Sequence, residues 1–491
     1  MIGAGLAGLS AALHLRGAGR DVVVLERESV PGGRAGVLDV DGYRFDTGPT
    51  VLTMPELLAQ AFAAVGEDLG EWLDLVRLDP AYRAHYPDGS TLDVRASTPD
   101  TAAEIARVCG QQEADGFLAL ADWTGQLYRA QIDDFIDRNI DSPLDLLTPR
   151  LPKLAALGGF RKLAPAVNRR LADERTRRLF SFQAMYAGLS PHDALALYAV
   201  ITYMDAVAGV WFPRGGIHAV PVALAGAAEK HGVDVRLGVQ ATQIELRNGR
   251  AVAVRTADGD RIPCDVVVVN ADVPVAYREL LPEEAMPARV RRQRYSPSCV
   301  LLLAGSSAHY SGTAHHSIHF GRAWRRSFTE LIDKGRLMSD PSFFVTKATH
   351  SDPSLAHAGK HTYGVLFPTP NLDAPIDWSR ERSAYRDEML RHLERAGYVG
   401  FGDAIEVEQV TTPVEWAARG MERGAPFAAA HTFLQTGPFR ASNLAPRVEG
   451  VVFAGSGTQP GVGIPMVLIS GRLAAERITG PLPRSRQAVV A

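Results

Sequence analysis

The chain has 491 residues, 46% hydrophobic and 22% charged, the balance of a folded protein large enough for two or three domains. Its formal net charge of −3 gives no general basic surface, so the composition argues against nucleic acid as a partner. The three cysteines, Cys109, Cys264 and Cys299, lie far apart without a CxxC pair, which disfavours a disulfide framework or a structural metal site and favours a reducing cytosol.

The chain opens on a glycine-rich turn followed by a helix and a strand. Gly3, Gly5 and Gly8 have the GxGxxG spacing of a dinucleotide-binding turn. Glycines there allow a tight bend, close approach of a pyrophosphate and close packing of helix on strand. Residues 21–26 are predicted to form the next, buried strand. The strand expected before Gly3 is reduced to residues 1–2, so we expect that the natural start lies upstream or that the chain is truncated. No signal peptide is expected.

A carboxylate and a second glycine-rich loop follow this unit. Glu26 stands 18 residues after Gly8, where it would accept hydrogen bonds from ribose hydroxyls and repel a 2′-phosphate, which disfavours NADP. This carboxylate weakens the alternative of a plain glycine-rich turn without a ligand. Gly32, Gly33 and Arg34 suit a loop that folds back over the nucleotide and brings a guanidinium to phosphates. The alternative for Arg34 is a solvent-exposed surface arginine.

Later segments alternate between extended and helical patterns. Asp41-Gly42 predicts a hairpin turn, residues from about 100 to 205 are predicted to be mainly helical with proline breaks, and 276–439 is mixed. Glycine and proline interrupt the apolar stretch 451–471, which predicts a strand, a loop and a helix start rather than a membrane span. A disordered tail is expected over 481–491. The predicted strands are 37–40, 43–46, 233–237, 241–246, 251–256, 265–271 and 451–454, and the last predicted helix is 465–478.

Longer motifs carry a family resemblance that covers nearly the whole chain. The most specific are GVWFPRGGIHAVPVALA at 209–225 and AGSGTQPGVGIPMVLISGRLAAE at 454–476. The sequence resembles the bacterial-type phytoene desaturases, which are carotenoid desaturases of the amine-oxidase-like FAD flavoprotein superfamily. The other motifs are GAGLAGLSAALHL (3–15), PGGRAG (31–36), GYRFDTGPTVLTMPELL (42–58), FSFQAMYAGLSP (180–191), VVNADVPVAYRELL (268–281), AHHSIHFG (314–321) and HTFLQTGPFR (431–440).

The resemblance implies an α/β fold in which a Rossmann-type FAD-binding domain is interleaved with a mixed α+β substrate domain. It places the FAD-binding domain in 1–95, 210–275 and 440–480, and a membrane-associated substrate domain in 96–209 and 276–439. A helix starting near residue 465 would then stabilise negative charge on the reduced flavin. Residue 456 is serine where many wider relatives have aspartate. The implied FAD-binding residues are Gly3, Gly5, Gly8, Glu26, Gly32, Gly33, Arg34, Ala241, Gly455, Ser456, Ile464, Pro465, Met466 and Val467.

The implied activity is FAD-dependent desaturation of the C40 hydrocarbon phytoene, by hydride transfer to flavin N5, to a lycopene-type product. A quinone or oxygen would reoxidise the flavin, because the sequence has no second GxGxxG for a nicotinamide. The expected location is the cytoplasm, peripheral on the inner face of the cell membrane. Three alternatives stay open: a desaturase or ketolase acting on another C30 or C40 carotenoid, an amine oxidase-like flavoenzyme, and a non-catalytic flavoprotein.

Candidate substrate and catalytic residues are less sharply marked. Asp145 is the first choice for a side-chain acid or base, with a helix-cap or turn role as its alternative. His315 and His316 are candidate polar groups of the pocket, with interior histidines bonded to the backbone as the alternative. Aromatic side chains are candidates for the walls of a substrate tunnel, although for each one taken singly ordinary core packing is the favoured alternative: Phe180, Phe182, Tyr186, Trp211, Phe212, Phe427 and Phe433.

A basic, apolar stretch over 146–172 is the candidate membrane contact. Its leucines and Phe160 alternate with six cations and no acidic residue, a composition that suits an anionic lipid surface. The alternative is a solvated helical pair packed on the domain. The six cations are Arg150, Lys153, Arg161, Lys162, Arg169 and Arg170.

Overall fold

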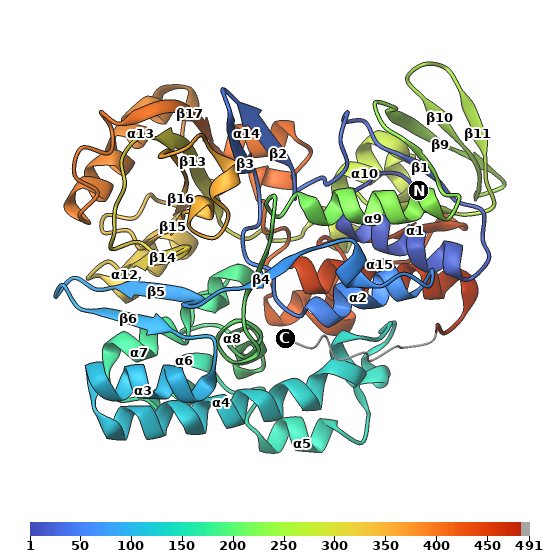
Figure 1. Ribbon diagram of the computed structural model, residues 1–491. Helices are drawn as coiled ribbons and strands as arrows, with labels where there is room; N and C mark the ends of the chain where they lie inside the picture. The colour runs from blue at the N-terminus through green and yellow to red at the C-terminus, as the bar shows by residue number, and fades with distance from the viewer. Residues whose placement is uncertain (483–491) are drawn as a thin grey trace.

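The computed structural model describes residues 1–482, which form three regions (Figure 1). A parallel sheet with its helices holds both ends of the described chain, at the right of the view. A seven-stranded sheet lies at the upper left, and a layer of helices from the first half of the chain lies below both.

The parallel sheet is centred on the shortened first strand. Ile2 forms bridges to Leu25 on one side and to Val269 on the other, and its backbone N–H donates to the carbonyl of Val268 at 2.9 Å. The two parallel pairs β1–β8 and β12–β18 are therefore joined through Ile2 into one sheet, so a two-residue segment suffices to link them. The bounds are β1 (Val23–Leu25), β8 (Asp234–Arg236), β12 (Val267–Val269) and β18 (Val451–Phe453).

Glycine brings the first and last helices of this region together. Helix α1 (Leu6–Gly17) packs on α15 (Ile464–Thr479) and is buried along most of its length. A Cβ at Gly471 would lie 2.3 Å from the carbonyl oxygen of Ala7, so only glycine allows this approach. The sheet region is completed by α2 (Pro55–Ala63), α9 (Ala219–Lys230) and the antiparallel strands β9 (Ala241–Arg247), β10 (Arg250–Thr256) and β11 (Arg261–Pro263).

The predicted hairpin and turns are confirmed. Strands β2 (Val37–Val40) and β3 (Tyr43–Asp46) pair antiparallel, with Asp41 and Gly42 at φ 46° and 76° between them. These left-handed values are those of the predicted turn. The strands predicted over 233–271 and at 451–454, and the helix at 465–478, are also present with ends shifted by a few residues.

The seven-stranded sheet contains the longest strands of the molecule. Its order is β17-β13-β16-β15-β14-β5-β6, with neighbours antiparallel except for the parallel pair β14–β5. One face packs on α13 (Trp378–Arg395), where Met389 and Leu393 join a core with Leu302 and Val365. The bounds are β5 (Tyr82–His85), β6 (Thr91–Val94), β13 (Ser298–Ser306), β14 (His316–His319), β15 (Phe343–Thr346), β16 (His361–Thr369) and β17 (Ile405–Thr411).

The helical region predicted over 100–205 is confirmed. Ser97 begins it as an N-cap, accepting the N–H of Asp100 at 3.2 Å. Pro143 and Pro152, predicted as breaks, stand in the first turns of short helical segments, where proline is tolerated. The helices are α3 (Thr98–Cys109), α4 (Gln111–Gln131), α5 (Leu151–Ala156), α6 (Leu163–Asn168), α7 (Glu174–Leu179) and α8 (Ala199–Tyr203).

Two observations bear on the predicted segmentation. Strands β5 and β6 fall inside segment 1–95 but pair into the seven-stranded sheet, because β5 lies beside β14. The domain boundaries otherwise stay a prediction. Leu482 packs on the main core, and the rest of the tail predicted to be disordered lies outside the described residues. The remaining elements are β4 (Leu75–Arg77), β7 (Trp211–Pro213), α10 (Val273–Leu280), α11 (Ala288–Arg291), α12 (Trp324–Phe328) and α14 (Pro413–Ala418).

Candidate active site

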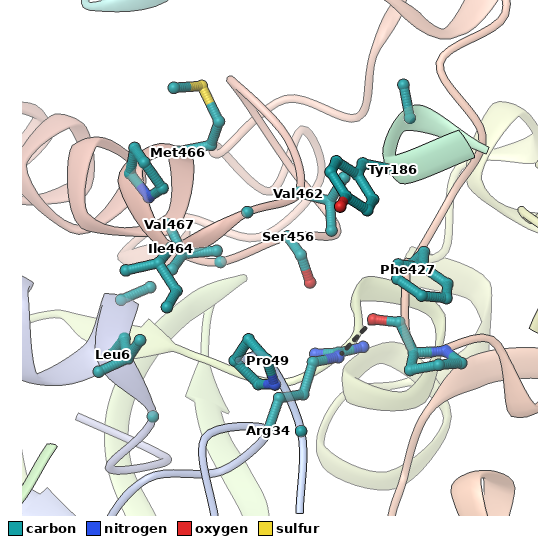
Figure 2. Close-up of a pocket in the computed structure, with 18 of the residues that line it drawn as sticks. Leu6, Arg34, Pro49, Tyr186, Phe427, Ser456, Val462, Ile464, Met466 and Val467 are labelled. Carbon is teal, nitrogen blue, oxygen red and sulfur yellow. Dashed lines mark hydrogen bonds between the residues drawn. The ribbon is translucent and has the colours of Figure 1, made fainter. Parts of the chain in front are cut away.

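A cavity of about 1450 Å³ runs from the first glycine turn into the helical region. Ordinary small-molecule pockets measure roughly 300–1,000 Å³, so this one has room for a large cofactor and a further ligand. One end is lined by the turn, Glu26 and the loop after it. The other end, which we call the apolar arm, is lined mainly by aliphatic and aromatic side chains. Figure 2 shows the middle of the cavity, where residues from both halves of the chain meet.

The glycine turn is shaped by backbone contacts that leave no room for side chains. Gly3 has φ +97°, and a Cβ at Gly8 would lie 2.2 Å from the carbonyl oxygen of Gly3. A Cβ at Gly5 would lie 2.6 Å from Oδ1 of Asn270. The N-cap residue of α1, Gly5, has no side chain that could accept the first backbone N–H groups of the helix, so those of Leu6 and Ala7 are left for an anionic ligand.

Asn270 holds the turn to the last strand of the sheet, a role that the sequence did not assign. Its Oδ1 accepts the N–H of Gly8 at 3.1 Å, and its Nδ2 donates to the carbonyl of Ala454 at 2.9 Å. Its only sequence signal is its position directly after β12, in the motif VVNADVP.

Glu26 lies where the ribose-binding carboxylate was predicted. It is buried and lines the cavity, and its two oxygens accept the N–H groups of Ala4 at 2.7 Å and Glu28 at 3.0 Å. A carboxylate has about four acceptor positions, so it retains capacity for ribose hydroxyls.

The loop of Gly32, Gly33 and Arg34 folds back over the turn. Gly33 has φ +56°, and a Cβ added there would lie 3.3 Å from the Cα of Gly5. Arg34 lines the cavity, donates to Asp272 at 2.7 Å and donates to the carbonyl of Pro426 at 3.1 Å, the dashed line in Figure 2. Its guanidinium is therefore fixed at the cavity wall.

The opposite wall is the loop between β18 and α15. Ser456 lines the cavity with a buried Oγ that has no hydrogen-bond partner within residues 1–482, an unsatisfied polar atom that a ligand would complete. Arg440, which the sequence also did not single out, is fully buried and donates to the carbonyls of Ser456 at 2.6 Å and Thr458 at 2.9 Å. Burial lowers the pKa of Arg440 to about 10, so the guanidinium stays charged near neutral pH.

Helix α15 begins at this wall with Gly463 as N-cap and without an acidic residue in its first turn, so its positive end is open to the cavity. With the glycine cradle and the free Ser456 hydroxyl, this fits the phosphates, ribityl chain and ring of FAD. Of the predicted FAD-binding residues, Gly8 lies behind the turn; those lining the cavity are Gly3, Gly5, Glu26, Gly32, Gly33, Arg34, Ala241, Gly455, Ser456, Ile464, Pro465, Met466 and Val467.

The predicted tunnel aromatics separate into two groups. Phe182, Phe427 and Phe433 line the cavity, as does Tyr186. Trp211 and Phe212 do not, and the tunnel prediction is not supported for them. Their strand β7 pairs with β4, which turns Phe212 into the core and sets Trp211 beside a guanidinium. The ring contacts outside the cavity are Phe212 with His315 at 4.5 Å, Phe180 with Phe117 at 4.8 Å and Trp211 with Arg77 at 5.4 Å.

Asp145 and the two histidines also lie outside the lining residues. Asp145 accepts the N–H groups of Asp141 at 2.8 Å and Ser142 at 2.9 Å in a capping box, so the geometry favours the capping interpretation over a catalytic one. These bonds lower its carboxyl pKa. His316 is buried between two backbone carbonyls at 3.2 Å each, and burial lowers its pKa to about 4. His315 contacts the hydroxyl of Ser351 at 2.8 Å.

The apolar arm ends among exposed side chains of the basic stretch. Ala155 and Phe160 are exposed and line the cavity, as does Phe433, which is 61% exposed. Deeper in, the arm is lined by side chains from several helices and from the seven-stranded sheet: Leu151, Leu154, Phe182, Met185, Leu195, Leu197, Val200, Ile201, Met204, Ile318, Phe320 and Phe344.

Comparison with known proteins also indicates a flavoprotein. Residues 6–479 match the family described as flavin containing amine oxidoreductase. The chain is 53% identical to a phytoene dehydrogenase of Streptomyces griseus, over 98% of this chain and 95% of the relative. The chain belongs to the bacterial-type phytoene desaturases of the flavin-containing amine oxidoreductase family. It is also 37% identical to a zeta-carotene-forming phytoene desaturase of Myxococcus xanthus, over 97% of this chain and 93% of the relative.

The fold comparison agrees with this family. An oxidoreductase structure from Methanosarcina mazei superposes with a TM-score of 0.64 at 17% identity, covering 96% of this chain and 97% of that one, which confirms the predicted fold class. The chain is thus an FAD-dependent oxidoreductase, as predicted. Within residues 1–482, no helix combines the length and the apolar character needed to cross a membrane, and no three or more His, Cys, Asp or Glu side chains are grouped to hold a metal ion.

Proposed function

We propose that this chain is a phytoene desaturase that introduces double bonds into a C40 hydrocarbon and gives a lycopene-type product. The apolar arm carries this proposal. A hydrocarbon offers no group for hydrogen bonding, so a matching site needs apolar walls that replace water along its length. The identities to a phytoene dehydrogenase and a phytoene desaturase support the same substrate class.

Desaturation removes a hydride and a proton from adjacent carbons, and bound FAD supplies the hydride acceptor. The residues of this chain hold the cofactor and orient the substrate. The glycine turn and the start of α15 provide backbone N–H groups for it, with Arg34 and Ser456 at the wall between them. The arm fixes the direction of an extended chain toward that wall and keeps water out, which is the main contribution to rate when orientation limits the reaction.

The test is anaerobic mixing of FAD-loaded protein with phytoene in liposomes. Bleaching of the flavin absorbance and appearance of more conjugated pigments are expected. A C30 substrate or an oxygenated carotenoid that bleaches the flavin faster would indicate one of the other carotenoid activities. Bleaching by an aliphatic diamine, but not by phytoene, would indicate an amine oxidase. Full FAD occupancy without bleaching by any of them would indicate a non-catalytic flavoprotein.

The proposed electron acceptor is a quinone or oxygen, because the sequence has one dinucleotide fingerprint and FAD uses it. Turnover in the presence of a quinone and without NAD(P)H or NAD(P)⁺ is the expected result. An obligatory nicotinamide requirement in steady-state turnover would contradict this part of the proposal.

The proposed location is the cytoplasmic face of the cell membrane, with the mouth of the arm on the lipid. Leu144 and Leu147 are each 72% exposed, and Leu434 is 71% exposed. Two short links connect the 139–147 and 433–443 segments: Gln459 contacts both the backbone of Ile140 and the carbonyl of Gly437, and Asn443 donates to Asn139 at 2.7 Å. Leu146 and Phe433, one from each segment, line the cavity, so we expect the exposed leucines beside them to flank its opening.

Four of the six cations in the basic stretch are available to lipid. Lys153, Arg161, Lys162 and Arg169 are exposed, whereas Arg150 and Arg170 are engaged elsewhere. The two engaged cations are Arg150, paired with Asp133 and Asp134, and Arg170, stacked on Trp123 at 4.1 Å.

A further inference from the structure

Asp205 is a buried carboxyl group that lines the cavity and that the proposed function leaves without a role. It lies in the π-helical turn Met204–Ala208 at the end of α8 and is 2% exposed. Single π-turns occur often at functional sites. Its two oxygens accept long hydrogen bonds, from the hydroxyl of Tyr82 at 3.4 Å and from Nε2 of Gln183 at 3.5 Å.

The groups recorded around Asp205 within residues 1–482 carry no compensating positive charge. Tyr82 comes from β5, and Gln183 and Tyr186 come from the 3₁₀ turn Phe182–Ala187. Thr202 on α8 contacts the amide oxygen of Gln183 at 3.3 Å. Behind Tyr82 stands His316 of β14, with ring centres 5.5 Å apart, and burial keeps that imidazole neutral near pH 7.

Burial without a cation raises the pKa of Asp205 well above its ordinary value of 3.8. A buried carboxyl without a charged partner costs stability, and an apolar side chain would fill the site without that cost. Perturbed carboxyl groups in a cleft are candidates for acid–base chemistry.

The neighbourhood of Asp205 reaches the part of the cavity where the arm meets the FAD end. Tyr186 interacts with both Tyr82 and Asp205. Figure 2 shows Tyr186 facing the same space as Val462 and Phe427, with Ser456 beside them. A substrate chain in the arm would therefore pass the carboxyl group close to the wall that holds the flavin.

We propose that Asp205 is the base that accepts the substrate proton, an inference that rests on the proposed desaturation. One C–H bond breaks with its electron pair, and the hydride passes to the bound FAD, which is the oxidant. The adjacent C–H bond also breaks, its electron pair becomes the new C=C bond, and its proton passes to an Asp205 oxygen. Reoxidation by a two-electron, two-proton acceptor consumes the hydride and this proton, so the carboxylate is restored.

The proposal sets the sign of a pH dependence. Below its raised pKa the carboxyl group is protonated and accepts no proton from the substrate. Above that pKa the carboxylate is present and is a stronger base than an ordinary aspartate. The rate of flavin bleaching by phytoene is therefore expected to increase with pH, and to level off once Asp205 is ionised.

The same group gives a readout that does not involve activity. The folded state holds the Asp205 proton at pH values where the unfolded chain has released it, so the stability that this group contributes falls as pH rises above about 3.8 toward the folded pKa. Asp205→Asn removes this loss. The melting temperature of Asp205→Asn minus that of wild type is expected to increase as pH rises.

The experiment measures anaerobic bleaching by phytoene, FAD content and melting temperature at several pH values for wild type, Asp205→Asn and Asp205→Glu. Asp205→Asn should keep its FAD, and phytoene should bleach its flavin at least about 100-fold more slowly than that of wild type, because positioned bases contribute roughly 10²–10⁴ in rate. The rate should not change with pH. Asp205→Glu should recover part of the rate with a displaced pH profile. The matched control is Asp122→Asn, on the exposed face of α4, which should behave as wild type.

The outcomes separate the two proposals. If phytoene does not bleach the flavin of the wild-type protein, the proposed function is overturned, and the role of Asp205 with it. Two results would overturn the role of Asp205 alone. One is a wild-type bleaching rate that does not increase with pH, and the other is an Asp205→Asn variant whose flavin is bleached at the wild-type rate. A melting-temperature difference that does not change with pH also contradicts a buried, protonated Asp205.

Discussion

The two ends of the cavity are built in different ways. At the FAD end, the central contacts are made by backbone, through the N–H groups of two helix starts and the space left by glycines at positions 3, 5, 8 and 455, with the side chains of Glu26, Arg34 and Ser456 at the wall. At the arm end they are made by side chains from α5, α8, the 3₁₀ turn 182–187 and the seven-stranded sheet. A few short motifs determine the FAD end, whereas the arm end forms only when segments distant in the sequence pack together.

This difference predicts how each end tolerates substitution. A backbone-built site fails when any atom is added, because carbonyl groups cannot move aside. In a side-chain-built site, truncation of a wall residue changes the rate of the reaction but changes the folding stability little, whereas loss of packing behind the wall lowers the folding stability. The following changes test this contrast, from the largest expected effect to the smallest.

Gly8→Ala should nearly abolish FAD binding. The added Cβ would lie 2.2 Å from the carbonyl oxygen of Gly3, and the helix and the turn would have to separate to admit it. FAD content after purification measures the effect. Gly312→Ala is the matched control, because a Cβ there meets nothing within 4 Å. Normal FAD content in Gly8→Ala would show that the turn is not rigid.

Phe212→Ala and Phe427→Ala should separate core from wall. Phe212 is fully buried outside the cavity, so its truncation is expected to lower the free energy of unfolding by about 3–5 kcal/mol. Phe427 is half-buried at the cavity wall, so its truncation should change stability little and slow bleaching by phytoene. Denaturant unfolding and anaerobic bleaching measure the two effects. Equal stability losses in both variants would contradict the assignment.

Replacing Lys153, Arg161, Lys162 and Arg169 with glutamine should weaken binding to anionic liposomes. Each cation near such a surface contributes about 1 kcal/mol, and salt screens the attraction, so the loss is about 4 kcal/mol at most and smaller at high salt. FAD content should not change. Co-sedimentation with anionic and neutral liposomes measures the effect.

The control for that variant removes four exposed arginines of α13, which Figure 1 shows at the opposite end of the molecule from α5. It should sediment as wild type does. If the basic-stretch variant also sediments as wild type at every salt concentration, this stretch is not the membrane contact. The control positions, each changed to glutamine, are Arg380, Arg382, Arg391 and Arg395.

Glu26→Ala should lower FAD affinity by about tenfold to a hundredfold. It removes acceptors for ribose hydroxyls and for the N–H of Ala4, and hydrogen bonds to charged groups contribute about 1.5–3 kcal/mol. Titration of flavin-free protein with FAD measures it. Glu229→Ala, an exposed carboxylate of α9, is the control. Unchanged affinity in Glu26→Ala would remove this carboxylate from the FAD site.

Most of the residues predicted for the FAD end line the cavity, because local spacing determines their positions. The glycine turn, the strand ending before Glu26 and the helix start near Pro465 each occupy a few consecutive residues, and the chemistry of each depends on those residues alone. Asn270 and Arg440 were missed at the same end, because each acts by linking segments far apart in the chain.

The arm was predicted in outline but not by residue. Aromatic composition does not distinguish a tunnel wall from a core. The sequence therefore did not separate Phe182, which lines the cavity, from Phe212, which the pairing of β4 with β7 places in the core. Asp145 was favoured because it lies beside the basic stretch, yet its carboxyl caps its own turn. Asp205 has no local motif, and only its burial in the assembled arm sets it apart.

The central claim is that a hydrocarbon reaches the flavin through the apolar arm, and one pair of variants on α5 tests it most directly. Ala155 is exposed and lines the cavity near its mouth, whereas its neighbour Ala156 is also exposed and does not line it. Both Ala155→Trp and Ala156→Trp should keep their FAD. In anaerobic mixing with phytoene liposomes, Ala155→Trp should bleach at least about tenfold more slowly, and Ala156→Trp should match wild type. Equal bleaching rates in all three proteins would contradict the account.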